Sequence, residues 1–154
     1  MSVQIVLGSK TDMKVADKAI AVLKELGVRY KLNIASAHRT PELVDRLVEE
    51  ADAEIFIAIA GLSAALPGVI AARTTKPVIG VPVSGTLNLD AILSVVQMPP
   101  GVPVAAVGLD RGDNAALLAA EMLALKNEKI RKSLSNYRKK MKDRIVHDSR
   151  EVEF

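Results

Sequence analysis

The chain has 154 residues, 49% of them hydrophobic, with no cysteine, two histidines and a formal net charge of +3. This length and apolar content fit one domain with a substantial core, and the lack of cysteine excludes disulfides, thiolate nucleophiles and thiolate metal sites. Because its two histidines, His38 and His147, lie at opposite ends of the sequence, we expect no metal site.

The amino terminus opens directly into a strand-like run, without the order of regions that a signal peptide has. No apolar run along the chain reaches the ~20 residues that a membrane-spanning helix needs. We therefore expect a cytoplasmic protein without a membrane partner.

Apolar runs and amphipathic stretches alternate along the chain. A run rich in β-branched residues at 3–7 predicts a strand, and Gly8-Ser9 then turns into a helix with apolar positions between 15 and 26. Gly27 lies where a helix-ending glycine is expected. Further strands are predicted at 29–35, 55–60, 77–81 and 102–107. Further helices are predicted at 41–51, within 62–74, and at 88–96, 113–126 and 128–144.

Strands that are separated by helices pair in parallel through right-handed crossovers. The pattern predicts an α/β fold: a three-layer α/β/α sandwich with a flavodoxin-like parallel sheet of about five strands. In such sheets ligands bind beyond the carboxyl ends of the strands, where the strand order reverses. The loops at 8–12, 35–41 and 60–68 should therefore lie side by side and form a site.

The first loop, Gly8-Ser9-Lys10-Thr11-Asp12, suits an anion. The N–H groups of a helix start attract negative charge, Ser9 can donate to phosphate, and Asp12 can accept from ribose hydroxyls. A structural role is equally open, with Ser9 as the helix cap and Asp12 as a favourable charge at the helix start. The loop lacks the spacing of a P-loop or a GxGxxG fingerprint, which disfavours nucleoside triphosphates and dinucleotides.

The second loop concentrates a hydroxyl, an imidazole and a guanidinium at Ser36, His38 and Arg39. Histidine titrates near neutrality, and the planar donors of arginine suit phosphate or carboxylate. Thr40 followed by Pro41 predicts a helix cap with proline at the first helical position. The alternatives are a polar surface histidine and an ion pair from Arg39 to a helix acid such as Glu42.

The third loop, 60–68, is almost free of polar side chains and rich in glycine and alanine. Such residues bring backbone N–H groups close to a ligand and leave room for something small, although tight packing of the next helix explains them equally well. The turn at 97–101 has no chemistry that composition assigns.

The chain from Lys126 onward is basic, with ten lysines and arginines against five acidic residues. Nucleic-acid binding is disfavoured because the helix predicted at 128–144 has a single aromatic residue, Tyr137, and no recognised motif. We favour a solvated helix face or a contact with another subunit.

Several motifs follow one another in a fixed order between about residue 3 and about residue 140. They are Gly8-Ser9-x-x-Asp12, Ser36-Ala37-His38-Arg39-Thr40-Pro41, the loop from Ala60 to Gly68, Gln97-Met98-Pro99-x-Gly101-x-Pro103-Val104, and Asn114-Ala115-Ala116-Leu117-Leu118-Ala119-Ala120. This set resembles the PurE family of purine biosynthesis, whose members make carboxyaminoimidazole ribonucleotide with a carboxylate on ring carbon 4.

The resemblance implies one PurE-like domain over 1–154 and a homo-octamer in which the basic helix at about 128–144 packs on neighbouring subunits. It implies that Ser9, Ser36 and Arg39 bind the substrate 5′-phosphate, that Asp12 binds the ribose, and that His38 is the general acid and base. From the third loop we expect substrate contacts of Gly61, Ser63, Ala65 and Leu66.

The chemistry agrees with this expectation and requires no metal or organic cofactor. Carbon 4 of an aminoimidazole is enamine-like, so it can attack carbon dioxide that is held beside it, and the ring must then lose a proton. A histidine can accept that proton and return one to the amine side. An apolar pocket favours loss of carbon dioxide from a carbamate and keeps it near the ring.

Two enzyme activities remain open, because the motifs are mixed. Mutases of the family rearrange the carbamate on the exocyclic amine and usually carry a histidine immediately before Leu-Pro-Gly, where this chain has Ala65. Other members carboxylate aminoimidazole ribonucleotide directly, and the third loop is similar to theirs. Arg39 and Pro41 follow the mutase form, so we favour the mutase. A flavodoxin-like module that binds a phosphorylated ligand without chemistry is the alternative outside enzymes.

Overall fold

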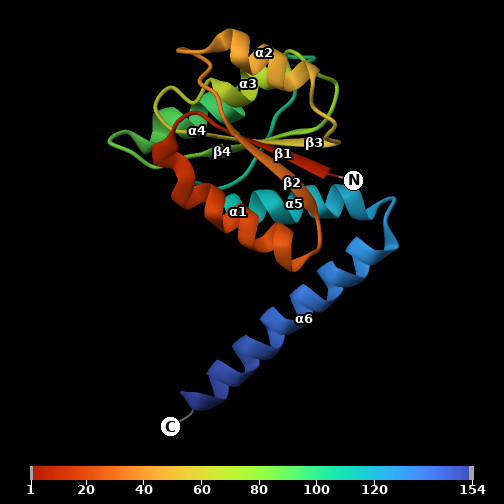
Figure 1. The fold of residues 1–154 in the computed structure, drawn as a ribbon. Helices are drawn as coiled ribbons and strands as arrows, with labels where there is room; N and C mark the ends of the chain where they lie inside the picture. Colours follow the sequence, from red (N-terminus) through yellow and green to blue (C-terminus); the bar gives the residue numbers. More distant parts are fainter. Residues whose placement is uncertain (1, 153–154) are drawn as a thin grey trace.

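Five parallel strands form the sheet in the order β2-β1-β3-β4-β5 in the computed structural model, which describes residues 2–152 (Figure 1). The strands are β1 (Ser2–Leu7), β2 (Arg29–Ile34), β3 (Ile55–Ala60), β4 (Val78–Pro82) and β5 (Ala105–Ala106). The predicted flavodoxin-like sheet is confirmed. The chain order reverses at β1, so the loops after the first three strands lie next to one another.

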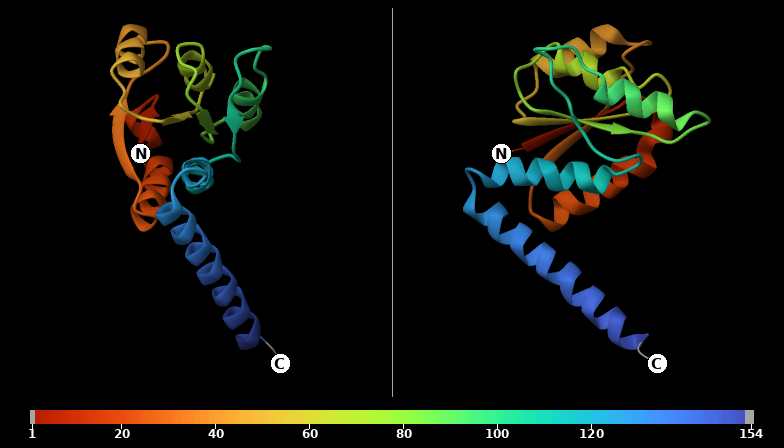
Figure 2. Two further views of the ribbon diagram at one scale, coloured as in Figure 1. Left: turned by 90° about the vertical axis from the view of Figure 1, so that its right-hand side faces the viewer. Right: turned by 180° about the vertical axis from the view of Figure 1, so that it is seen from behind.

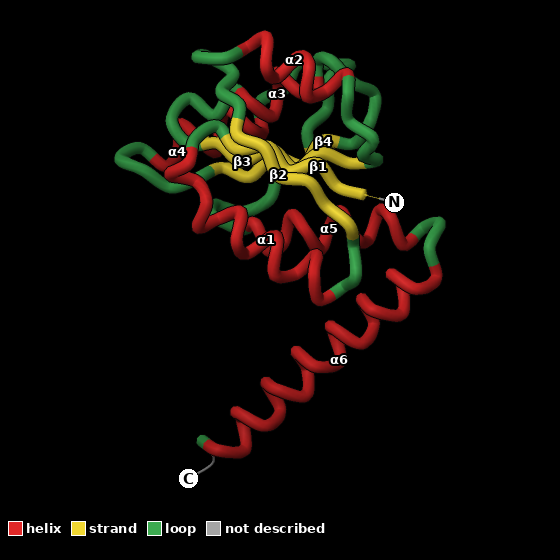
Figure 3. Tube along the Cα trace, in the orientation of Figure 1, coloured by secondary structure: helices red, strands yellow, loops and turns green. Residues whose placement is uncertain are grey.

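Helices cover both faces of the sheet, as the alternating pattern predicts (Figures 1 and 3). On one face lie α1 (Met13–Glu25), which follows the short 3-10 helix η1 (Lys10–Asp12), and α5 (Gly112–Ala124). On the other lie α2 (Pro41–Glu49), α3 (Leu66–Ala71) and α4 (Asn88–Val96). Two apolar clusters fill the spaces between these layers, and β3 is buried along its whole length between them.

The fifth predicted strand is much shorter than expected. We predicted 102–107, but only Ala105 and Ala106 pair with β4. Pro103 has no N–H to donate and lies just before the paired residues, at the edge of the sheet, where proline limits pairing.

The carboxy-terminal helix is longer than predicted, since α6 spans Glu128–Glu151 rather than ending near residue 144. No glycine or proline interrupts it, and the i,i+4 ion pair Arg144–Asp148 lies in its last turns. Its first part packs on α5 through Ile130 and Leu134. Arg138 and Lys140 form ion pairs with Glu121 of α5 and Glu25 of α1, but every residue from 138 to 152 is exposed. Figure 2 shows the rest projecting away from the sandwich.

None of the helices in residues 2–152 combines the length and apolar character that crossing a membrane requires.

Close packing of α5 against α1 depends on Gly112. A Cβ atom at this position would overlap the carbonyl oxygen of Val15, which belongs to the backbone of α1 and cannot rotate away. The two helices meet within the cluster that also contains Ala16, Ala116 and Ala119.

We expect Gly112→Ala to lower the free energy of unfolding by about 1–3 kcal/mol, because the added methyl group forces the two helices apart. Urea unfolding at a fixed protein concentration measures this loss. Gly85→Ala is the control, since its Cβ atom meets nothing within 4 Å. Equal stability of the two variants would contradict the packing argument.

Candidate active site

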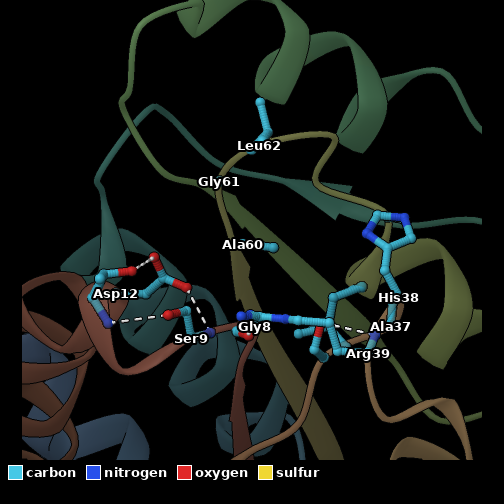
Figure 4. Close-up of a pocket in the computed structure, with 13 residues that line it drawn as sticks. Gly8, Ser9, Asp12, Ala37, His38, Arg39, Ala60, Gly61 and Leu62 are labelled. Carbon is cyan, nitrogen blue, oxygen red and sulfur yellow. Dashed lines mark hydrogen bonds between the residues drawn. The ribbon is translucent and has the colours of Figure 1, made fainter.

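The three predicted loops meet because the hydrogen bonding of the sheet continues past the strand ends. The Gly8 N–H donates to the Ile59 carbonyl at 3.0 Å, and the Ala35 N–H donates to the Leu7 carbonyl at 2.9 Å. Between the loops lies a pocket of about 360 Å³ (Figure 4). It is lined by Gly8, Ser9, Thr11, Asp12, Ser36, Ala37, His38, Arg39, Ala60, Gly61, Leu62, Ala65 and Leu66.

In the first loop, the structural interpretation of Ser9 and Asp12 is confirmed, whereas their contacts with a substrate stay a prediction. The Ser9 hydroxyl accepts from the Thr11 N–H at 3.3 Å, and the Asp12 carboxylate accepts from the Ser9 N–H at 3.0 Å. This reciprocal capping fixes the turn into η1. Both side chains still line the pocket, so the cap also orients a hydroxyl and a carboxylate towards a ligand.

Asp12 is 6% exposed, and this burial raises the pKa of its carboxyl above the ordinary value. The hydrogen bonds from Ser9 and Thr11 and the charge of Arg39 act in the opposite direction and lower the pKa by less. The loss of hydration of the carboxylate is therefore the largest influence on the pKa of Asp12.

Arg39 connects the second loop to the first. Its Nε donates to the Ser36 hydroxyl at 3.1 Å, and its Nη2 donates to the Gly8 carbonyl at 2.9 Å. The guanidinium therefore lies across the pocket floor, as Figure 4 shows, with donors left for an anion. Within residues 2–152 it forms no ion pair with Glu42, so that alternative is wrong.

The Thr40 side chain does not cap α2, contrary to the prediction. Its hydroxyl instead accepts from the Ser36 N–H at 2.9 Å and contacts the Ser36 carbonyl at 3.3 Å. Pro41 occupies the start of the helix as expected. Thr40 thus closes the second loop on itself and holds Ser36 beside the pocket.

His38 lies in the pocket wall away from Asp12, with its imidazole directed towards the third loop in Figure 4. The side chain is exposed, so both a ligand in the pocket and water can reach it. The structure brings it together with Ser36 and Arg39, as the sequence predicted.

The third loop supplies an apolar wall made of Gly61, Ala65 and Leu66. Ser63 lies outside the residues that line the pocket, and its N–H donates to the Asp90 carboxylate at 2.9 Å. Whether its side chain contacts a substrate stays a prediction.

Five lining residues are not among the predicted site residues: Gly8, Thr11, Ala37, Ala60 and Leu62. Thr11 and Ala37 lie inside the motifs, but neither has a property that separates it from its neighbours. Leu62 is 89% exposed, and a large apolar side chain in a loop of small residues is the signal that could have identified it.

Neither Gly8 nor Gly61 is required by the packing of the protein itself. A Cβ atom at Gly8 would lie 3.7 Å from Ala60, and one at Gly61 would lie 3.6 Å from Val83, both ordinary contacts. The missing side chains are therefore better explained by the pocket, where they leave space for a ligand.

The fold and the pocket define a flavodoxin-like α/β protein with a pocket of polar and apolar groups at the carboxyl edge of its sheet. The family model described as AIR carboxylase matches residues 2–144, and the chain belongs to this family. A protein of Methanocaldococcus jannaschii, N5-carboxyaminoimidazole ribonucleotide mutase, is 58% identical over 149 residues, which are 96% of this chain and 95% of that protein.

Other relatives differ in length or identity. A Methanobrevibacter smithii protein, a probable N5-carboxyaminoimidazole ribonucleotide mutase, is 49% identical, and the match covers 97% of this chain but only 45% of that protein. The crystal structure of Treponema denticola PurE is 32% identical with a TM-score of 0.89, covering 99% of this chain and 98% of that one.

The raised pKa of Asp12 predicts a pH-dependent cost to folding. A carboxyl that binds its proton more tightly in the folded state stabilises the fold fully below its ordinary pKa of ~3.9. This contribution is lost as pH rises through the higher pKa of the folded state. Asp12→Asn removes the titration while keeping an oxygen for the Ser9 N–H.

We therefore expect the stability of the wild type to fall relative to Asp12→Asn as pH rises from about 4 to 7. Urea unfolding of both proteins at matched pH and concentration measures the difference. A difference that stays constant over this range would contradict the assignment.

Proposed function

We propose that this chain is a mutase of purine biosynthesis that moves the carboxyl group of N5-carboxyaminoimidazole ribonucleotide from the exocyclic amine to ring carbon 4. The observation that carries this proposal is the 58% identity, over nearly the whole of both chains, with a protein of that name. The pocket supports it, because cationic and hydroxyl groups face an apolar wall across a histidine.

The polar side of the pocket suits the nucleotide. Ser9, Ser36 and Arg39 would bind the 5′-phosphate, with the guanidinium donating from a position already fixed by Ser36 and Gly8. Asp12 would accept from the ribose hydroxyls. These contacts would hold the base near His38 and the third loop.

The reaction then conserves every atom and needs no oxidant. The bond between the exocyclic nitrogen and the carboxyl carbon breaks, and carbon dioxide remains beside the ring. Carbon 4 attacks it and forms the new carbon–carbon bond. His38 accepts the proton that carbon 4 loses and returns one to the amine, so the side chain ends in its starting state.

The apolar wall of Gly61, Ala65 and Leu66 suits the carboxyl group. A carbamate loses carbon dioxide more readily when its charge is desolvated, and the neutral molecule is retained by shape rather than by charge. Ala65 stands where mutases of the family usually have histidine, so here the acid–base work would fall to His38 alone.

Direct carboxylation of aminoimidazole ribonucleotide is the second candidate, and the mixed motif of the third loop is the observation that favours it. The names of the curated relatives support the mutase instead. A module that only binds a phosphorylated ligand would not explain a histidine between the phosphate clamp and the apolar wall.

We further propose a cytoplasmic homo-octamer formed by single-domain chains, in which the projecting part of α6 packs on neighbouring copies. Its exposed residues include Met141 at 54% and Ile145 at 68%, one turn apart on the same helix face. A projecting helix with an apolar stripe gains stability by burying that stripe. A cytoplasmic location fits a substrate whose phosphate charge prevents passage through membranes.

We expect His38→Asn to lower kcat roughly 100- to 10,000-fold while nucleotide affinity stays within about twofold, because the acid–base group is lost and the phosphate clamp is kept. Steady-state assays with the carbamate substrate and calorimetric titration of aminoimidazole ribonucleotide measure the two effects. Unchanged turnover would remove His38 from the mechanism.

The same assays separate the two enzyme activities. The wild type should convert the carbamate to the carbon 4 carboxylate without added bicarbonate. Product that forms only from aminoimidazole ribonucleotide with bicarbonate would establish the carboxylase and overturn the mutase.

We expect Ile145→Asp to raise the dissociation constant of the assembly about tenfold or more, because a charge would replace an apolar side chain that the assembly would bury. Sedimentation over a range of concentrations measures this. Asn136→Asp is the control, since Asn136 is exposed and the variant places the same charge on the opposite face of the helix. Identical oligomer distributions for both variants would argue against this interface.

A further inference from the structure

The third loop contains two neighbouring residues in an unusual backbone conformation. Ser63 has a φ of 58° and Ala64 a φ of 22°, although neither is glycine. Residues with a Cβ atom rarely adopt positive φ values, and such a shape persists only where the surroundings hold it. Gly61, Leu62 and Ala65, on either side of this turn, line the pocket.

Two hydrogen bonds hold the turn. The Ala64 N–H donates to the Gly61 carbonyl at 2.7 Å, within the loop itself. The Ser63 N–H donates to the carboxylate of Asp90 at 2.9 Å, and Asp90 lies in the first turn of α4. The second bond therefore fixes the exposed tip of the loop to a separate element.

Asp90 itself is exposed, but the helix that carries it is anchored in the core. The next residue, Ala91, is buried in the same apolar cluster as Ala64 and Leu66. The start of α4 and the base of the third loop thus belong to one apolar cluster, and the Asp90 carboxylate reaches the loop tip at the surface.

We propose that Asp90 is a positioning residue for the carboxyl transfer, holding the third loop in the strained shape that confines carbon dioxide beside the ring. This inference rests on the proposed function. Carbon dioxide has no net charge for Arg39 or His38 to bind, so its retention depends on the shape of the apolar wall. A loosened wall lets it escape after the carbamate bond breaks, leaving aminoimidazole ribonucleotide in place of product.

The test measures how the carbamate substrate is divided between the carbon 4 carboxylate and released aminoimidazole ribonucleotide, after subtraction of spontaneous decarboxylation. We expect Asp90→Ala to raise the released fraction about tenfold with the affinity for the nucleotide unchanged. Asp90→Asn keeps an oxygen acceptor and should stay close to wild type. Adding Ser63→Gly to Asp90→Ala should restore part of the retention, because glycine adopts the same backbone conformation without strain.

Asp113→Ala is the matched control. Asp113 is also an acid in the first turn of a helix, α5, but its partners are Arg111 and the Asn114 N–H rather than the third loop. Its loss should leave the division of products unchanged. The proposal would be overturned if Asp90→Ala released the same fraction of aminoimidazole ribonucleotide as the wild type. It would also be overturned if Asp113→Ala raised that fraction as much as Asp90→Ala does.

Amide hydrogen exchange of residues 61–65 tests the same proposal without using the reaction. Asp90→Ala should exchange faster there than Asp113→Ala, and equal exchange would also overturn the role of Asp90. If the wild type failed to convert the carbamate while Asp90→Ala still showed faster exchange, the proposed function would fall and the structural tie between α4 and the loop would stand.

Discussion

The site depends on the parallel alignment of three strand ends. Because β1 pairs with β2 on one side and β3 on the other, the loops after all three strands begin at the same edge of the sheet. The bonds from the Gly8 N–H to Ile59 and from the Ala35 N–H to Leu7 extend this alignment into the loops. Because the loops begin at the same edge of the sheet, Arg39 can reach the Gly8 carbonyl, which lies 31 positions earlier in the chain.

The pocket places its polar and apolar groups on opposite walls. The first two loops contribute a helix-capping serine, a buried carboxylate and a guanidinium, each fixed by hydrogen bonds within its own loop or to the neighbouring loop. The third loop contributes almost no polar atoms. A phosphorylated nucleotide can be held by charge on one wall while the uncharged partner is confined by shape on the other, which lets binding and confinement be adjusted independently.

The order of the elements and the meeting of the three loops were predictable, because apolar periodicity is local and the topology of α/β sheets is restricted. Features that depend on neighbours in space were not. The short β5 reflects the missing donor of Pro103 at an edge, and the Thr40 hydroxyl accepts from the Ser36 N–H of its own loop instead of capping the helix. The backbone N–H of Ser63 donates to the Asp90 carboxylate, and no pattern in the sequence links these two residues.

The distribution of backbone strain supports a distinct role for the apolar wall. Within residues 2–152 the non-glycine residues with positive φ are Ser63, Ala64 and Asp110. The first two shape the third loop, and the Asp110 carboxylate accepts from the Ser84 N–H, next to Val83, which would be the neighbour of a Cβ atom at Gly61. A wall that binds by charge tolerates small shifts because electrostatic attraction varies gradually with distance, whereas a wall that confines a small neutral molecule does not. Carboxylates that accept from the Ser63 and Ser84 N–H groups thus tie the apolar wall to the rest of the fold, an arrangement that favours confinement by shape.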